Sequence, residues 1–157
     1  MSSTRSGEKR QQTPAGAVAA GDRHTAEAAA AVLADGGNAF DAVLAGLFAA
    51  CIAEPVLCSL GGGGFLLAQP AGGDAGLHDF FCQTPGRCLP VDELEFLPIH
   101  ADFGTARQEF HIGMGAVAVP GLVAGAFAIH EELCRLPMAR LMAPAIALAR
   151  RGVAMAP

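Results

Sequence analysis

Apolar residues recur at intervals of three and four along two stretches in the first third of the chain. The first stretch predicts a helix over residues 23–34, which Asp22 or Thr25 can cap. The second predicts a helix over residues 39–53, with Asn38 as its N-cap. Two adjacent glycines separate the stretches, so the pattern indicates two consecutive helices joined by a tight turn.

The second predicted helix is apolar on every face apart from Asp41, which we expect in its first turn, where the helix dipole favours a carboxylate. A helix of this kind needs cover on all sides. We therefore expect it at the centre of a structure larger than the sheet this chain can build.

Later segments are shorter and more mixed. Residues 84–114 combine proline, glycine and charge without a regular period, which predicts a long irregular loop. Pro144 is expected to kink the last helix or to lie in its first turn, and Gly152 to cap its C-terminus. The remaining expected elements are strands at 16–21, 65–68, 76–83 and 116–119, the second and third forming a hairpin, and helices over 122–134 and 138–151.

These elements predict a mixed α/β (α+β) fold, in which Ala-rich apolar helices pack on a small sheet. A length of 157 residues suits one domain or part of one, and 52% apolar against 16% charged residues excludes disorder for most of the chain. Residues 1–14 are polar, without the apolar core of a signal peptide, and are expected to form a disordered arm.

The composition limits the classes of partner and the cellular compartment that we expect for this protein. A net charge of −5, with neither Trp nor Tyr, argues against nucleic-acid binding. The most apolar run, residues 42–53, is shorter than the roughly 20 residues that span a bilayer, so no membrane partner is expected. Five cysteines without a CxxC spacing suit a reducing compartment, and we expect a cytoplasmic protein.

Candidate chemistry is sparse in the residues themselves. The run Gly61–Gly64 could form an anion nest, but no Gly-Lys-Ser/Thr follows, and a tight turn explains it equally well. Ser59 lies outside a GxSxG motif and is expected in a turn. Cys82 with His78 would suit a thiol nucleophile, yet four residues of strand separate them by about 13 Å, so a buried thiol is favoured. The five histidines have no metal-ligand spacing, and no metal is assigned.

Three longer stretches resemble one known family. They are AVAAGDRHTAEAAAAVLADGGNAFDAVLAGLFAACIAEPVLCSLGGGGFLLAQ (Ala17–Gln69), HDFFCQTP (His78–Pro85) and GMGAVAVPGLVAGAFAIHEELCRLPMARLMAPAIALARRGVAM (Gly113–Met155). Their content, order and spacing are similar to the N-terminal part of the large subunit of the gamma-glutamyltransferase (gamma-glutamyl transpeptidase) family. Residues 15–157 are therefore identified as the N-terminal portion of such a domain.

The resemblance implies an N-terminal-nucleophile hydrolase fold, a four-layer αββα sandwich. It implies an enzyme that cuts itself to expose a threonine, which attacks a gamma-glutamyl amide with its own amino group as base. Neither a metal nor an organic cofactor is expected. No Thr-Thr-His tripeptide occurs in the sequence, so we expect a chain truncated before the small subunit, with no catalytic residue of its own.

The resemblance also suggests substrate-binding residues. Typical members carry an arginine that binds the substrate α-carboxylate, and Phe81 occupies the matching position. Phe81 and Gln83 are expected to shape the acyl pocket, with Cys82 on the opposite face. Arg87 could replace the missing arginine, although a solvated loop arginine explains it as well.

Three functional hypotheses follow. In the first, the chain is part of a gamma-glutamyltransferase-like enzyme that acts on a small-molecule gamma-glutamyl or acyl-amide substrate and is joined to a missing small-subunit segment. A monomer and a homo-oligomer both stay open. In the second, it is a non-catalytic remnant or a subunit that depends on a partner, since its apolar helix and small sheet lack cover. A third reading, an anion-binding module on Gly61–Gly64, predicts stabilisation by phosphate.

Overall fold

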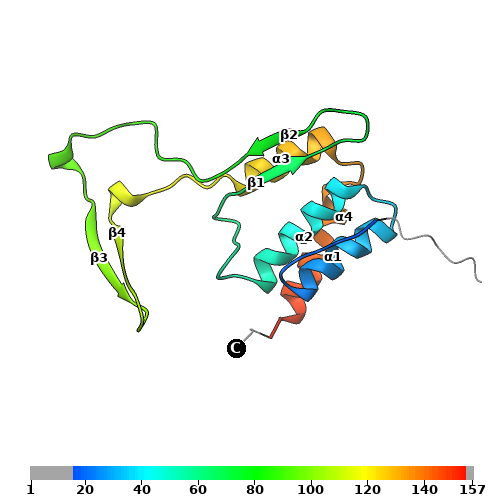
Figure 1. Cartoon of the computed structure of the whole chain (residues 1–157), viewed down its shortest axis with the longest axis horizontal. Helices are drawn as coiled ribbons and strands as arrows, with labels where there is room; N and C mark the ends of the chain where they lie inside the picture. Colours follow the sequence, from blue (N-terminus) through cyan, green and yellow to red (C-terminus); the bar gives the residue numbers. More distant parts are fainter. Residues whose placement is uncertain (1–15, 155–157) are drawn as a thin grey trace, which may run out of the picture. The chain divides into compact units, whose positions relative to one another are not determined.

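The computed structural model describes residues 16–154, and the predicted arm at residues 1–14 lies outside them. The described chain separates into two compact units (Figure 1). We call them the helical unit, residues 16–54 and 134–154, and the hairpin unit, residues 55–133.

The helical unit begins with α1 (Arg23–Ala34), which has the predicted bounds. The side chain of Asp22 caps it by accepting hydrogen bonds from the backbone N–H groups of His24, at 2.7 Å, and Thr25. The Thr25 hydroxyl donates to Glu54 Oε2 at 3.0 Å. The start of α1 is thereby tied to the residue that ends the next helix.

Helix α2 (Ala39–Ala53) also matches its prediction, and it starts with a capping box. Asn38 Oδ1 accepts the Asp41 backbone N–H at 2.8 Å, while Asp41 Oδ2 accepts the Asn38 backbone N–H at 2.7 Å. Small residues let α1 approach closely: a Cβ at Gly46 would lie 3.6 Å from the Ala29 Cβ. Leu44, Ala45 and Ala49 are fully buried.

Helix α4 (Met138–Arg151) completes the unit and packs on α2. Its buried side chains, Leu141, Ala145 and Leu148, lie on one face, and Leu148 joins Ala28 and Ala49 in a core cluster. Gly152 caps the helix at φ +77°, as predicted. Pro144 lies inside the helix, at its seventh residue, and not in its first turn.

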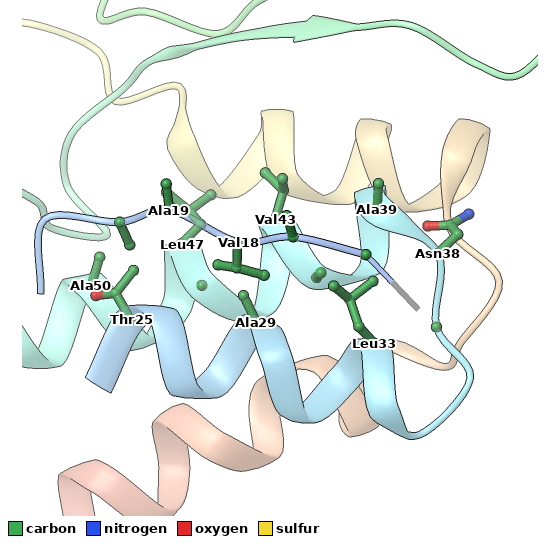
Figure 2. Close-up of a pocket in the computed structure, with 16 residues that line it drawn as sticks. Val18, Ala19, Thr25, Ala29, Leu33, Asn38, Ala39, Val43, Leu47 and Ala50 are labelled. Carbon is green, nitrogen blue, oxygen red and sulfur yellow. The ribbon is translucent and has the colours of Figure 1, made fainter. Parts of the chain in front are cut away.

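Residues 16–20 form no strand, so the prediction of one at 16–21 is wrong for this structure. The extended segment has no strand partner among the described residues, and a run of alanines adds little strand preference. Figure 2 shows it crossing α1 and α2 above a pocket of about 590 Å³. The larger apolar side chains that line this pocket are Val18, Leu33, Val43 and Leu47.

The hairpin unit contains the predicted hairpin, formed by β1 (Phe65–Ala68) and β2 (Gly76–Asp79). The strands are antiparallel, with Phe65 opposite Asp79 and Ala68 opposite Gly76. The second strand ends at Asp79 and not near Gln83. Beyond the strands, Gly64 and Phe80 still exchange backbone hydrogen bonds, and the Gly62 carbonyl accepts two N–H groups at the start of α3 (Leu122–Leu133).

Residues 84–114 are not wholly irregular, which corrects the prediction of a long loop. They contain a second antiparallel hairpin, β3 (Leu97–Asp102) and β4 (Arg107–Ile112), with a short 3₁₀ turn at Val91–Glu93 before it. Gly104, at φ +81°, makes the tight turn between them, and its N–H donates to Asp102 Oδ1 at 2.8 Å. The alternation of Leu97, Ile99 and Ala101 was the missed strand signal.

The strand predicted at 116–119 is also wrong. Met114–Ala116 form a 3₁₀ turn, and only Val119 pairs, in an isolated bridge to Gln83. Helix α3 matches its prediction but ends one residue earlier, at Leu133. Among the described residues, the four strands form two separate two-stranded sheets. The mixed α/β (α+β) class is confirmed. Within residues 16–154 no helix has the length and apolar character needed to cross a membrane.

Candidate functional site around Phe80–Gln83

The glycine run Gly61–Gly64 packs against the segment that follows β2. A Cβ at Gly63 would lie 2.6 Å from both the Cys82 nitrogen and the Phe80 carbonyl oxygen, so a side chain cannot fit there. Gly64 and Phe80 exchange two backbone hydrogen bonds, at 3.0 and 3.3 Å. The close-packed turn, one of the two readings of this run, is therefore what the structure contains.

Two backbone donors of the run are already used, which argues against the anion-nest reading: the Gly62 N–H donates to the Ser59 carbonyl and the Gly64 N–H donates to the Phe80 carbonyl. The Gly62 carbonyl accepts the backbone N–H groups of Gly121 at 3.1 Å and Leu122 at 3.0 Å. These groups open α3, where an anion would otherwise bind. Ser59 lies in the preceding turn, as predicted, and its carbonyl accepts the Gly62 N–H at 3.0 Å.

Phe80 anchors the segment on α3. A Cβ at Gly125 would lie 2.3 Å from the Phe80 Cβ and Cγ atoms, and a Cβ at Gly121 would lie 2.2 Å from the Phe80 carbonyl oxygen. Glycine is therefore needed at Gly121, just before the helix, and at Gly125, inside it, for the Phe80 backbone and ring to come this close. Since side chains alternate along an extended chain, Phe81 then points to the other face.

Phe81 stacks on Phe65 from β1, with ring centroids 5.4 Å apart and planes 9° apart. Phe65 and Phe81 are 59% and 52% exposed, so the stacked pair is an exposed apolar feature of this chain. The Phe81 backbone N–H donates to Asp79 Oδ1 at 3.0 Å. Phe81 was predicted from the sequence as a candidate, but Phe65 was not, because its apolar neighbours made it indistinguishable from an ordinary strand residue.

The other two predicted substrate-binding residues are exposed. Gln83 lies two residues from Phe81, which places both side chains on one face of an extended chain, and its backbone exchanges two hydrogen bonds with Val119, at 2.7 and 3.1 Å. Arg87 lies beyond Pro85 in an irregular stretch. Within residues 16–154 its guanidinium makes no hydrogen bond or ion pair, and nothing brings it to Phe81.

Cys82 and His78 do not form a catalytic pair. The imidazole Nδ1 of His78 lies 3.9 Å from Glu132 Oε2, on α3. Cys82 is half-buried behind the Phe81 face, with its backbone against Gly63. The preference for a buried thiol over a nucleophile agrees with this placement.

Asp41 is a buried carboxylate in the helical unit. It lies in the first turn of α2, as predicted, and it also connects that helix to a distant turn. Its Oδ1 accepts the backbone N–H groups of Arg135 at 3.0 Å and Leu136 at 3.1 Å, which joins the start of α2 to the turn before α4. Burial alone would raise the pKa of Asp41, but hydrogen bonds from the Asn38, Leu136 and Arg135 backbone and the Cys134 thiol hold the pKa below its usual range. Burial and the nearby Asp41 charge raise the pKa of Cys134 to about 12. A lone acidic residue in an apolar helix was the signal for this role.

Histidines gather on the β3–β4 hairpin without forming a metal centre. His100 and His111 each place Nε2 at 3.5 Å from a Glu109 carboxylate oxygen, and His111 stacks on Phe96 with ring centroids 4.0 Å apart. Across residues 16–154 no group of three or more His, Cys, Asp or Glu side chains has the arrangement of a metal site.

Comparison with known proteins identifies the class to which this arrangement belongs. The family model described as "Gamma-glutamyltranspeptidase" matches residues 25–157. The structure of the Helicobacter pylori gamma-glutamyltranspeptidase superposes on 92% of this chain and 40% of that one, with a TM-score of 0.73 and 29% identity. The chain belongs to the gamma-glutamyltranspeptidase family, and its fold is part of the N-terminal-nucleophile hydrolase sandwich.

Two curated relatives carry different names. The Acylase ACY 1 proenzyme of Pseudomonas sp. strain V22 is 37% identical over 132 residues, which cover 83% of this chain and 24% of that protein. The glutathione hydrolase proenzyme of Pseudomonas aeruginosa is 34% identical over 138 residues, covering 87% and 24%. The chain thus spans about a quarter of the length of these relatives.

Proposed function

We propose that this chain supplies the N-terminal part of the large subunit of a gamma-glutamyltransferase-like enzyme, which transfers or hydrolyses gamma-glutamyl or related acyl amides. The family match over residues 25–157 carries the proposal. The chain is similar both to a protein named acylase and to one named glutathione hydrolase. We therefore retain acyl amides and gamma-glutamyl amides as the two candidate classes of donor.

In the proposed reaction the nucleophile is a threonine at a chain start created by self-cleavage, outside residues 1–157. Its hydroxyl oxygen bonds to the acyl carbon, and its α-amino group takes the hydroxyl proton and passes it to the leaving amine as the C–N bond breaks. Water or an acceptor amine then cleaves the resulting ester, which releases an acid or a new amide and restores the threonine.

Phe81, Gln83 and Arg87 are the residues that we propose for substrate binding. Phe81 cannot give the bidentate hydrogen bonds of an arginine to a carboxylate. We expect Phe81→Arg in the assembled enzyme to raise kcat/KM for a gamma-glutamyl donor, measured with gamma-glutamyl-p-nitroanilide. A fall in kcat/KM for that donor would show that Phe81 does not occupy the carboxylate-binding position.

The proposed function is tested by expressing the whole reading frame that contains residues 1–157, with any small-subunit-like segment encoded beside it. We expect mass spectrometry to find a new N-terminal threonine, and the product to hydrolyse a p-nitroanilide of a gamma-glutamyl or acyl group. Replacement of that threonine by alanine is the control and should abolish both. A folded product that neither cleaves itself nor hydrolyses any such amide contradicts the proposal.

A further inference from the structure

The rings of Phe65 and Phe81 come from two adjacent chain segments that the hairpin register brings together. Phe65 lies opposite Asp79, and Phe81 lies two residues beyond Asp79, on the same face. This is a diagonal cross-strand pair, which aromatic rings can bridge. Their planes are 9° apart and their centroids 5.4 Å apart, so the rings stack on one another, and the surface that they offer to a further ring is the outer face of the pair. About half of each residue is exposed in this chain.

The backbone holds this surface in place before any ligand arrives. The two hydrogen bonds between Gly64 and Phe80 lie directly between the two aromatic residues in the ladder. The Phe81 N–H is held by Asp79 Oδ1 at 3.0 Å, and the Gln83–Val119 bridge fixes the chain beyond it. A prepared surface loses little conformational entropy on binding, which favours recognition of a small ligand.

Charge near the pair selects against an anionic ligand. The charged group that the structure places on the Phe81 backbone is the Asp79 carboxylate, and like charges repel. The surface therefore suits a flat, uncharged group that stacks on aromatic rings.

We infer that Phe65 and Phe81 together recognise an aromatic acyl group without an α-carboxylate, such as phenylacetyl, on the donor amide. This inference rests on the proposed function and names its substrate class. Phe81 replaces carboxylate binding by ring stacking, and Phe65 supplies the second ring of the surface. Both residues determine specificity, while the reacting threonine belongs to the segment outside residues 1–157.

The test compares three p-nitroanilides, phenylacetyl, acetyl and gamma-glutamyl, on the enzyme expressed from the whole reading frame. We expect the phenylacetyl amide to have the highest kcat/KM. Phe65→Leu and Phe81→Leu keep apolar volume but remove a ring, and each should lower kcat/KM for the phenylacetyl amide about tenfold. The acetyl amide, which has no ring to stack, should change by less than about twofold.

Phe103→Leu is the matched control, because Phe103 is 63% exposed in the turn of the other hairpin. It should leave all three substrates unchanged. Equal losses on the phenylacetyl and acetyl amides, or a fall in Tm that matches the loss of activity, would show that the pair is structural and overturn the inference. So would a wild-type preference for the gamma-glutamyl amide, although the proposed function would then stand.

If none of the three amides is cleaved, the proposed function fails, and a calorimetric titration with phenylacetamide decides the inference separately. Binding that weakens about tenfold in Phe81→Leu but not in Phe103→Leu supports the surface. Absence of binding to the wild-type protein overturns it.

Discussion

The helical unit buries its apolar side chains, whereas the hairpin unit leaves large apolar side chains exposed on one face. In the helical unit, alanines and leucines of α1, α2 and α4 are buried, and one carboxylate, Asp41, is buried with them. In the hairpin unit the large side chains on one face of the β1–β2 hairpin are exposed: Phe65 59%, Leu67 74%, Leu77 64% and Phe81 52%.

The difference lies in what orders each unit. The helices are capped and pack on one another, so their core comes from side chains. The hairpins are ordered by backbone hydrogen bonds and by glycines that allow close approach at Gly63 and Gly125. A face ordered through its backbone leaves its side chains free to meet a substrate or another segment, which is why the candidate site lies there.

The largest expected effect is that of Asp41→Ala in the helical unit. The change leaves the N–H groups of Arg135, Leu136 and Asn38, whose hydrogen bonds to Asp41 are partly buried, without their acceptor. At about 1–3 kcal/mol for each unsatisfied group, we expect a loss of about 3 kcal/mol or more in the free energy of unfolding. Urea denaturation followed by circular dichroism at 222 nm measures it, and a loss below about 1 kcal/mol would show that water replaces the carboxylate.

In the hairpin unit Gly125→Ala tests whether close approach orders the site. The new Cβ would lie 2.3 Å from the Phe80 ring, so Phe80 must move, at a cost of about 1–3 kcal/mol. Gly86→Ala is the control, because a Cβ there meets nothing within 4 Å. Equal unfolding midpoints for the two variants would contradict the tight contact between Phe80 and α3.

Acid should weaken the helical unit through Asp41. Its folded pKa lies below the ordinary 3.8, so its ionised form stabilises the fold above that pH, and this contribution is lost as the pH falls through the folded pKa. Denaturation between pH 6 and pH 2 should show this loss, and Asp41→Asn should reduce it. An unchanged pH profile in Asp41→Asn would assign the acid sensitivity to other groups.

The smallest expected effect is on reactivity and not on stability. With a pKa of about 12, the Cys134 thiol is almost wholly protonated at pH 8, whereas Cys88 is exposed. Iodoacetamide at pH 8 should therefore modify Cys88 well before Cys134, as peptide mass spectrometry can follow. Asp41→Asn removes the charge that helps raise this pKa and should speed modification of Cys134. Equal rates at Cys88 and Cys134 in the wild-type protein would contradict the placement of Cys134 beside Asp41.

The sequence by itself determined α1, α2, α3 and α4 to within one residue, because caps and helical spacing act within a turn or two of chain. It also determined the β1–β2 hairpin. The resemblance of its motifs to those of the family made Phe81 a candidate. The β3–β4 hairpin was missed although its alternation is local, since Pro98 and charged neighbours obscured the period.

Only the tertiary structure decided which distant residues meet. Asp41 accepts hydrogen bonds from the backbone of Arg135 and Leu136, more than 90 residues away in the sequence. Phe65 contacts Phe81 only because of the register of the hairpin. No local preference encodes such contacts, because they depend on how whole elements pack and on the chain closing long loops. The residue type at each position determined which interactions its side chain could make. The packing of the elements determined which partner it met.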